Sequence, residues 1–504
     1  MPTVHPRYSV SPERSTALSA RLLGAILVLA ACAGDPPTVP NDPALAVDPA
    51  PLSSISVCHR SGATGTIVDV SPADLAGRLS QGDYLTSLVV SHASDQPSDG
   101  AHFRHIGDAI AAARAGRLAR GEFRSAACRI TIAVAAGAFR GTAFPTADKS
   151  LERFPLVVDV PAITLRGALV MELDAAGRAT GHGVGGFETT LVPVRPMPIL
   201  DVSIPVIVAN AHPSGPAAHG LVIEGFVFQS GHHIVDEIGG QAVFASRVRG
   251  LAIRGNRIES GFSESIDLRE SSATIKRNHL EGTGGTCDIC LAGPGTYLAS
   301  GNWLGAGGIP GFLTVPAIGT PVPDGVEPTV LPTSSTVTAE IVNNEVRDHL
   351  RVPVGVGIRF GGLGILAPDV HGTIHGVVRD NLLVNNNFAM IFEAAFPTPD
   401  TELRADMDVA LSGNVMRQSC QANLLVAFTR HTTALGLTDF PYLRNSTYRL
   451  SLGGNLQWKD VWFGNAKGYG NRLVVDGRTI PYGTRQFYDP DTCPGLATLA
   501  SAAP

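Results

Sequence analysis

Residues 253–258 read Ile-Arg-Gly-Asn-Arg-Ile, and residues 275–280 repeat the pattern as Ile-Lys-Arg-Asn-His-Leu. In both copies an apolar residue stands three positions before an Asn, and another apolar residue follows the Asn closely. Similar segments recur along the chain and carry these Asn residues: Asn256, Asn278, Asn302, Asn344, Asn381, Asn414 and Asn455. A unit that recurs in this way indicates a solenoid, in which each coil stacks on its neighbours.

The intervals between these Asn residues are 22, 24, 42, 37, 33 and 41. A coil therefore needs about 22 residues, and the longer intervals carry insertions. Asn tolerates left-handed backbone geometry and bonds its own turn, and stacked Asn side chains can form a ladder. We interpret all seven as structural turns. Leucine-rich repeats are the main alternative, but they need several leucines at fixed spacing, which this chain lacks.

The composition agrees with many short strands joined by tight turns. Of 504 residues, 44% are hydrophobic and only 16% are charged, and there are 56 Gly and 36 Pro. The formal net charge is -6. No long basic run occurs, so the chain has no electrostatic footprint for a nucleic-acid partner.

The start of the chain predicts export. A segment with several arginines precedes an apolar run over residues 22–31, which is typical of a signal peptide. Residues 29–32, Leu-Ala-Ala-Cys, resemble the bacterial lipobox. The resemblance implies that residues 1–32 are a lipoprotein signal, that Cys32 is lipidated, and that residues 33–54 form a tether to the cell envelope. Because Ala33 follows Cys32, we expect the outer membrane. The alternative is an ordinary cleaved signal.

Six further cysteines remain, an even number that favours disulfides in an oxidising compartment. They are Cys58, Cys128, Cys287, Cys290, Cys420 and Cys493. The sequence leaves their connectivity open. The pairing we favour joins Cys58 to Cys128 and Cys420 to Cys493, one pair at each end, with a tight local bridge between Cys287 and Cys290. A zinc site at the last pair is disfavoured, because no second CxxC or HxxxH motif exists.

The segment after residue 100 suggests a family. A helix-forming run within residues 101–120 precedes an apolar strand over residues 130–139. This order resembles the opening of pectin-lyase-like proteins, where a helix caps the first coil. The resemblance implies an all-β, right-handed parallel β-helix over residues 101–490. A small Cys-His-x-x-Gly segment at 55–100 would precede it, and a tail at 491–504 would follow.

Each coil also has a second short strand before the Asn turn. If its flanking apolar residues point inward, the middle residue faces solvent. The expected outward column contains Val243, Asp267, Cys290, Arg359, Ile391 and, at its end, Trp462. A second outward column adds Arg269 and Glu393. We therefore expect Asp267, Arg269, Arg359 and Glu393 to share one face.

By the resemblance, such a face acts on polysaccharide. Arg269 or Arg359 could bind an anionic sugar, and Asp267 and Glu393 could serve as acid, base or metal ligand. Two functions follow: a lyase or hydrolase of an acidic glycan, or a non-catalytic protein that binds envelope glycan or acts as a scaffold. No metal site is predicted from the residues, although the resemblance makes Ca²⁺ possible. We expect a monomer. The structural alternative for the four residues is a surface salt-bridge patch.

Overall fold

The computed structural model describes most of the chain between residues 54 and 480. The described residues are 54–61, 64–92, 100–142, 147–193, 205–211, 216–229, 241–259, 261–262, 264–282, 287–292, 334–349, 355–362, 370–394, 403–419, 422–427, 430–431, 437–438, 445–453, 461–464 and 470–480. The predicted signal peptide with Cys32, the tether, Cys420, Cys493 and the tail lie outside them. Neither helix among the described residues has the length and apolarity to cross a bilayer.

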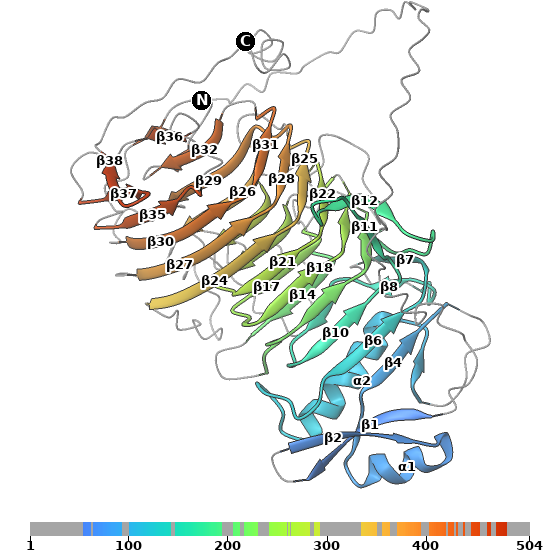
Figure 1. The fold of residues 1–504 in the computed structure, drawn as a ribbon. Coiled ribbons are helices and arrows are strands. Elements are labelled where there is room, and N and C mark those ends of the chain that lie inside the picture. The colour runs from blue at the N-terminus through green and yellow to red at the C-terminus, as the bar shows by residue number, and fades with distance from the viewer. Residues whose placement is uncertain are drawn as a thin grey trace, which may run out of the picture. The chain divides into compact units, whose positions relative to one another are not determined.

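Three sheets of stacked strands make up most of the described chain (Figure 1). Sheet 1 runs through β4 (Ser87–Val90), β6 (Ile130–Val134), β10 (Ile163–Arg166), β15 (Val222–Glu224), β18 (Leu251–Arg254), β21 (Ala273–Lys276), β24 (Ser334–Val342), β27 (Val370–Arg379), β30 (Leu403–Ser412), β35 (Thr447–Ser451) and β37 (Arg472–Val475). Its edge strands are β5 (His102–Phe103) and β38 (Arg478–Ile480).

Sheets 2 and 3 are built in the same way. Sheet 2 runs through β8 (Glu152–Arg153), β7 (Gly137–Thr142), β13 (Thr189–Pro193), β16 (Phe226–Phe228), β19 (Arg257–Ile258), β22 (His279–Glu281), β25 (Glu345–Arg347), β28 (Leu382–Val384) and β31 (Val415–Arg417). Sheet 3 runs through β9 (Leu156–Val158), β14 (Ile207–Asn210), β17 (Val243–Ser246), β20 (Glu264–Arg269), β23 (Cys287–Ala292), β26 (Val356–Gly362), β29 (Phe388–Ala394), β32 (Ala422–Ala427) and β36 (Val461–Gly464).

From β10 to β32 the chain visits the three sheets in turn, and each visit adds a strand parallel to the strand of the preceding coil. For example, β18, β19 and β20 make one coil and β21, β22 and β23 make the next. Long parallel sheets of this kind agree with the predicted β-helix. Two short antiparallel hairpins are added to them: β11 (Met171–Leu173) with β12 (Ala179–Gly183), and β33 (Arg430–His431) with β34 (Leu437–Thr438). At the end of sheet 1, β38 pairs antiparallel with β37.

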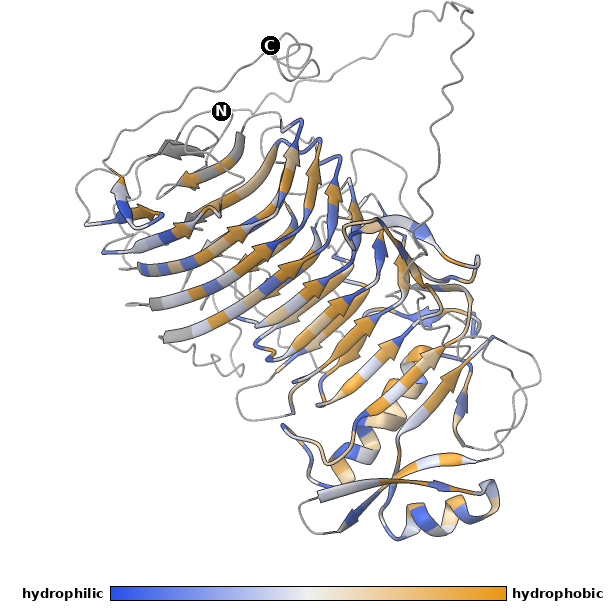
Figure 2. Cartoon of the chain, viewed as in Figure 1, coloured by the Kyte–Doolittle hydropathy of each residue, from blue (hydrophilic) through white to orange (hydrophobic). Residues whose placement is uncertain are grey.

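The interior is filled by stacks of like residues. In sheet 3, Val243, Ile266, Ile289, Ile358 and Met390 are opposite one another on successive strands, and all are buried. Figure 2 shows such apolar segments recurring on strand after strand. Because alternate side chains point to opposite sides of a strand, this stack fixes which residues face outward.

The corner between sheets 1 and 2 contains the predicted Asn ladder. Asn278 Nδ2 donates to Asn344 Oδ1 at 3.0 Å, and Asn344 Nδ2 donates to Asn381 Oδ1 at 2.9 Å. Asn256 and Asn414 extend the ladder at its two ends. Asn302 and Asn455 lie outside the described residues.

One detail of the predicted turn is wrong. The left-handed residue of this corner is the one before each ladder Asn: φ is 55° at Arg277, 56° at Asn343 and 58° at Asp380. The ladder residues themselves are not among the described residues with positive φ. Asn is therefore used here for its side-chain amide, which forms hydrogen bonds with the coils on both sides. Its tolerance of a left-handed backbone conformation is not used.

The segment before the coils has its own small sheet. It contains β1 (Ile55–Ser61), β2 (Thr64–Val70), β3 (Tyr84–Leu85) and α1 (Pro72–Ser80). The last strand of the predicted 55–100 segment, β4, pairs with β6, so sheet 1 begins before residue 101. The second helix, α2 (Ile106–Ala119), packs against β6 and β9 of the first coil and against β3.

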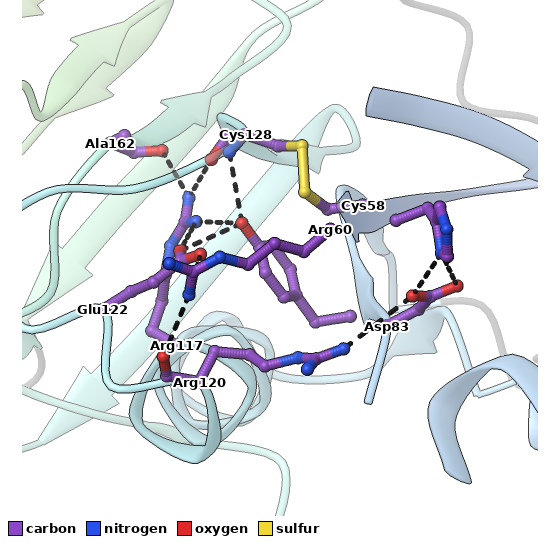
Figure 3. Close-up of a disulfide and its surroundings, with 10 residues drawn as sticks. Cys58, Arg60, Asp83, Arg117, Arg120, Glu122, Cys128 and Ala162 are labelled. Atoms are coloured by element: carbon purple, nitrogen blue, oxygen red, sulfur yellow. Dashed lines mark hydrogen bonds and ion pairs between the residues drawn. A yellow bond between two sulfur atoms is a disulfide. The ribbon is translucent and has the colours of Figure 1, made fainter. Parts of the chain in front are cut away.

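A disulfide and a buried arginine connect these parts (Figure 3). Cys58 of β1 is bonded to Cys128, two residues before β6. Arg117 of α2 is fully buried and donates to Glu122, to the Tyr84 hydroxyl and to the carbonyl of Cys128 (Figure 3). A charge is tolerated in the interior when it is paired and hydrogen-bonded. Arg117 pairs with Glu122, and its two terminal nitrogens donate to groups of the small sheet and the first coil.

Candidate functional site

The strand register places the predicted outward residues of sheet 3. Asp267 is opposite Cys290, Cys290 is opposite Arg359, and Arg359 is opposite Ile391. Their interior neighbours are the apolar stack described above, so this row lies on the outer face. Asp267 and Arg359 are therefore two strand steps apart, about 10 Å at the usual strand spacing.

Val243 does not belong to this row. The register pairs Val243 with Ile266 and Phe244 with Asp267. The predicted alignment of β17 is therefore one residue out of register. Such a slip exchanges the two sides of a strand, so Val243 lies in the interior stack and Phe244 takes the outward position.

The second outward row contains Arg269 and Glu393, but not as neighbours. Arg269 is opposite Ala292, and the row continues through Gly361 to Glu393. Three strand steps separate the two backbones, about 14 Å. The side chain of Glu393 lies outside the described residues, as does that of Trp462. The expected cluster of four is thus reduced to Asp267, Arg269 and Arg359.

Asp267 and Arg269 form a close ion pair. The Arg269 Nη2 donates to Asp267 Oδ2 at 2.8 Å, and Nε lies 2.6 Å from Oδ1. The two residues stand two positions apart on β20 and so point to the same side. The Asp267 side chain is 0% exposed and that of Arg269 is 21% exposed.

This burial corrects the expectation that the row faces solvent. Phe244, Cys290 and Ile391 are also buried, although none belongs to the interior cluster. The ion pair therefore lies among buried apolar side chains of the outer face of sheet 3, with the partly exposed Arg359 in the same row. A salt-bridge patch that merely solvates a surface would not have these surroundings.

The surroundings change the acidity of both partners. Burial raises the pKa of Asp267, while the positive charges of Arg269 and Arg359 act against that rise. The negative charge of Glu264 raises it further. The Asp267 carboxylate in turn raises the pKa of Arg269. The result is a buried carboxyl group that binds a proton more readily than an exposed aspartate does.

Glu264 is the functional candidate that the sequence analysis missed. It is the first residue of β20, and Gln241 Nε2 donates to its Oε2 at 3.0 Å. Strict alternation puts residues 264 and 267 on opposite sides of a strand, which is why the pattern did not indicate it. Its negative charge raises the pKa of both Asp267 and Arg269.

Cys290 of this row forms a disulfide with Cys287, with Cα atoms 5.7 Å apart. Cys290 stands between Asp267 and Arg359 in the register. The bonded sulfurs leave no thiolate pair for zinc. No three His, Cys, Asp or Glu side chains come together as a metal site anywhere in the described ranges. The residues described here therefore do not fit a Ca²⁺ cage.

A second cluster of polar side chains lies near the start of β20 and β23. Ser265 Oγ donates to Asp288 Oδ1 at 3.2 Å, and His349 Nδ1 lies 3.5 Å from Asp288 Oδ2. All three residues are fully buried. The carboxylate stands between hydroxyl and imidazole, whereas an activated serine needs the imidazole beside its hydroxyl. We interpret this group as a buried link between successive coils.

Comparisons with known proteins give no family. No family model matches the chain, and no curated protein matches it. Among solved structures, the catalytic domain of a GH87 α-1,3-glucanase in complex with nigerose aligns at 11% identity and a TM-score of 0.30, over 78% of this chain and 65% of the glucanase. The A-module of Azotobacter vinelandii mannuronan C-5 epimerase AlgE4 aligns at 11% identity and a TM-score of 0.25, over 76% of this chain and 95% of the module. At these TM-scores neither alignment bears on what this chain does.

Proposed function

We propose that this chain is a pectin-lyase-like β-helix that acts on an acidic polysaccharide at the outer face of sheet 3. One observation carries the proposal: the buried carboxyl of Asp267 is paired with Arg269, with Glu264 and Arg359 close enough to affect it. Acid–base cleavage of a charged glycan requires a general acid, a second carboxyl group and a guanidinium group close to one point of the sheet.

Each residue has a role in this proposal. Asp267 is the general acid: it must bind a proton before it delivers one to the oxygen of the departing sugar. Glu264 is the second carboxyl and takes a proton from water or from the sugar ring carbon. Arg359 binds the carboxylate of a uronic residue, because a guanidinium matches a carboxylate in two hydrogen bonds. Arg269 holds Asp267 in place.

We also propose where the reaction takes place. Residues 1–32 would export the chain, and lipid on Cys32 would tether it to the cell envelope, in the outer membrane. The substrate would then be an envelope or extracellular glycan. A chain labelled with a radioactive lipid precursor, compared with a Cys32→Ala variant, tests this directly.

The activity is tested by incubating the purified mature chain with polygalacturonate, alginate and neutral polysaccharides. Unsaturated products, read by ultraviolet absorbance, report a lyase, and new reducing ends without them report a hydrolase. Asp267→Asn keeps the shape of the side chain but cannot donate the proton. We expect kcat/KM to fall by about 100-fold or more, the usual range for an acid catalyst.

Two further variants separate substrate binding from catalysis and control for nonspecific effects of substitution. Arg359→Gln, at a partly exposed residue, should raise KM about tenfold with little change in kcat. Glu172→Gln, at an exposed residue of β11, is the matched control and should change neither constant. If no substrate yields product while Arg359→Gln weakens glycan binding, the enzyme proposal is wrong and the non-catalytic alternative replaces it.

A further inference from the structure

Sheet 1 becomes wider in its later coils. β24 has 9 residues and β27 and β30 have 10 each, whereas β18 and β21 have 4 each. The interior side of the added part is filled by buried residues, namely Val337, Ile374, Met407 and Tyr448. The residue after each of them points outward. These outward residues form one row across four neighbouring strands, Thr338, His375, Asp408 and Arg449, which we call the outer row.

All four side chains of the outer row are exposed. Asp408 has His375 on one side and Arg449 on the other. Charges this close would be expected to pair. Yet in the described part of the chain none of these three side chains has a hydrogen bond or an ion pair.

The same sheet shows that such pairing is feasible. Glu224 of β15 has arginines at the equivalent positions of both neighbouring strands, Arg166 and Arg254. It contacts each of them at 2.6 Å. Cross-strand neighbours on this face can therefore reach one another. In the outer row the carboxylate and the guanidinium instead stay available to a ligand.

We propose that the outer row binds an extended, uncharged polysaccharide chain. The Asp408 carboxylate accepts hydrogen bonds, the Arg449 guanidinium donates them, and the His375 imidazole and Thr338 hydroxyl do both. Sugar hydroxyls are donors and acceptors, so they satisfy all four. The charges of Asp408 and Arg449 cancel, which gives no advantage to a polyanion.

The geometry favours a polymer. Four strands at a spacing of about 4.8 Å make a row about 14 Å long, which is longer than one sugar ring. The row lies on sheet 1, whereas the site of the proposed function lies on sheet 3. The inference therefore goes beyond the proposed function and does not depend on it.

The test is affinity electrophoresis of the purified mature chain through gels that contain dextran, a mixed-linkage β-glucan or a galactomannan. Polygalacturonate serves as the charged polymer. We expect retardation by at least one neutral polymer. Asp408→Ala and Arg449→Ala should each weaken it about fivefold, as expected when one set of hydrogen bonds is lost. Arg478→Ala, at an exposed arginine of β38, should leave it unchanged.

Two outcomes would overturn the inference: no retardation of the parent chain by any neutral polymer, or equal retardation of the parent, Asp408→Ala and Arg449→Ala. Retardation by polygalacturonate alone would also count against it. Asp267→Asn should bind the neutral polymer as the parent does. A loss of catalysis at Asp267 is thereby separated from a loss of binding at the outer row.

Discussion

Asn344 connects three coils through a single side chain. Its Nδ2 donates to the carbonyl of Ile275 and to Asn381 Oδ1, each at 2.9 Å, and its Oδ1 accepts from the backbone N–H of Asn278 at 2.9 Å. Asn344→Ala removes these three buried hydrogen bonds, and Asn381 Oδ1 keeps the backbone N–H of residue 344 as a donor. Each costs about 1–3 kcal/mol, so we expect the free energy of unfolding to fall by about 3 kcal/mol in urea denaturation.

The matched control is Thr336→Ala, at an exposed residue of the same strand, β24. Exposed substitutions of this kind usually change stability by less than about 0.5 kcal/mol. An equal effect of the two variants would mean that the ladder contributes nothing beyond the turn itself.

His219 gives the fold a dependence on pH. Burial lowers its pKa, and so do the charges of Arg124 and Arg249. Its Nδ1 accepts a hydrogen bond from the backbone N–H of Arg249 at 3.1 Å, which requires the unprotonated ring nitrogen. In the unfolded chain the pKa returns to about 6.5. The unfolded state then binds the proton more readily, so stability is full above pH 6.5 and is lost as the pH falls toward the lower folded-state pKa.

The test compares urea midpoints at pH 7.5 and 5.5. His219→Asn retains an acceptor near the position of Nδ1 but does not titrate, so its midpoint should fall less than that of the parent. His92, whose pKa is also lowered by burial, is present in both proteins and its effect cancels. If the parent and the variant lose the same stability on acidification, His219 is not the group responsible.

The row of sheet 3 that contains Asp267 shows what the alternation of residues along a strand can and cannot predict. Alternation places Asp267, Cys290, Arg359 and Ile391 together, and the register agrees. It could not predict their burial, because burial depends on what covers a face and not on which face a residue points to. It also missed Glu264, because alternation puts residues 264 and 267 on opposite sides of β20.

At the scale of the element, the hairpin β11–β12 packs against sheet 2 at β22 and β25. It approaches so closely that a Cβ on Gly181 would lie 2.7 Å from a ring carbon of His279. Arg257 Nη1 donates to the Gly181 carbonyl at 3.3 Å. Gly181 also has a φ of +80°, which favours glycine. The hairpin therefore needs glycine at this position for both space and conformation.

Gly181→Ala and Gly186→Ala separate these two requirements. Gly186 has a φ of +70°, but nothing lies within 4 Å of its added Cβ. Both variants should lose about 1 kcal/mol to backbone strain, and Gly181→Ala should lose about 1–3 kcal/mol more through overpacking. Hydrogen exchange over residues 171–183 should rise only in Gly181→Ala. Equal effects would show that the hairpin does not depend on this contact.

Elements with a strong local sequence pattern are easier to predict than elements added between the coils. The strand at residues 130–134 and the helix at residues 106–119 follow from apolar runs and helix propensity. The hairpin residues 171–183 have no repeat partner in the next coil, so nothing in the repeat indicates them. The pairing of β4 with β6 joins residues that the repeat does not relate, and it too became visible only in three dimensions.

At the scale of the whole molecule, contacts within each sheet run between strands of successive coils. Stability is then close to a sum of nearest-neighbour terms, and an end coil that lacks one neighbour is the weakest. The first coil has α2 against it and is held to the small sheet by Cys58–Cys128. Opening that disulfide should therefore act at this end first.

Cys58→Ala/Cys128→Ala tests this. The disulfide spans 70 residues of sequence, for which loop entropy predicts a loss of about 4 kcal/mol. Hydrogen exchange should rise in β4 and β6 before it rises in β24. The control, Cys287→Ala/Cys290→Ala, opens a bridge that spans 3 residues and should cost roughly 2 kcal/mol, with no effect on β6. If opening either bridge released the coils uniformly, the coils would unfold as one unit, and the nearest-neighbour description would fail for this protein.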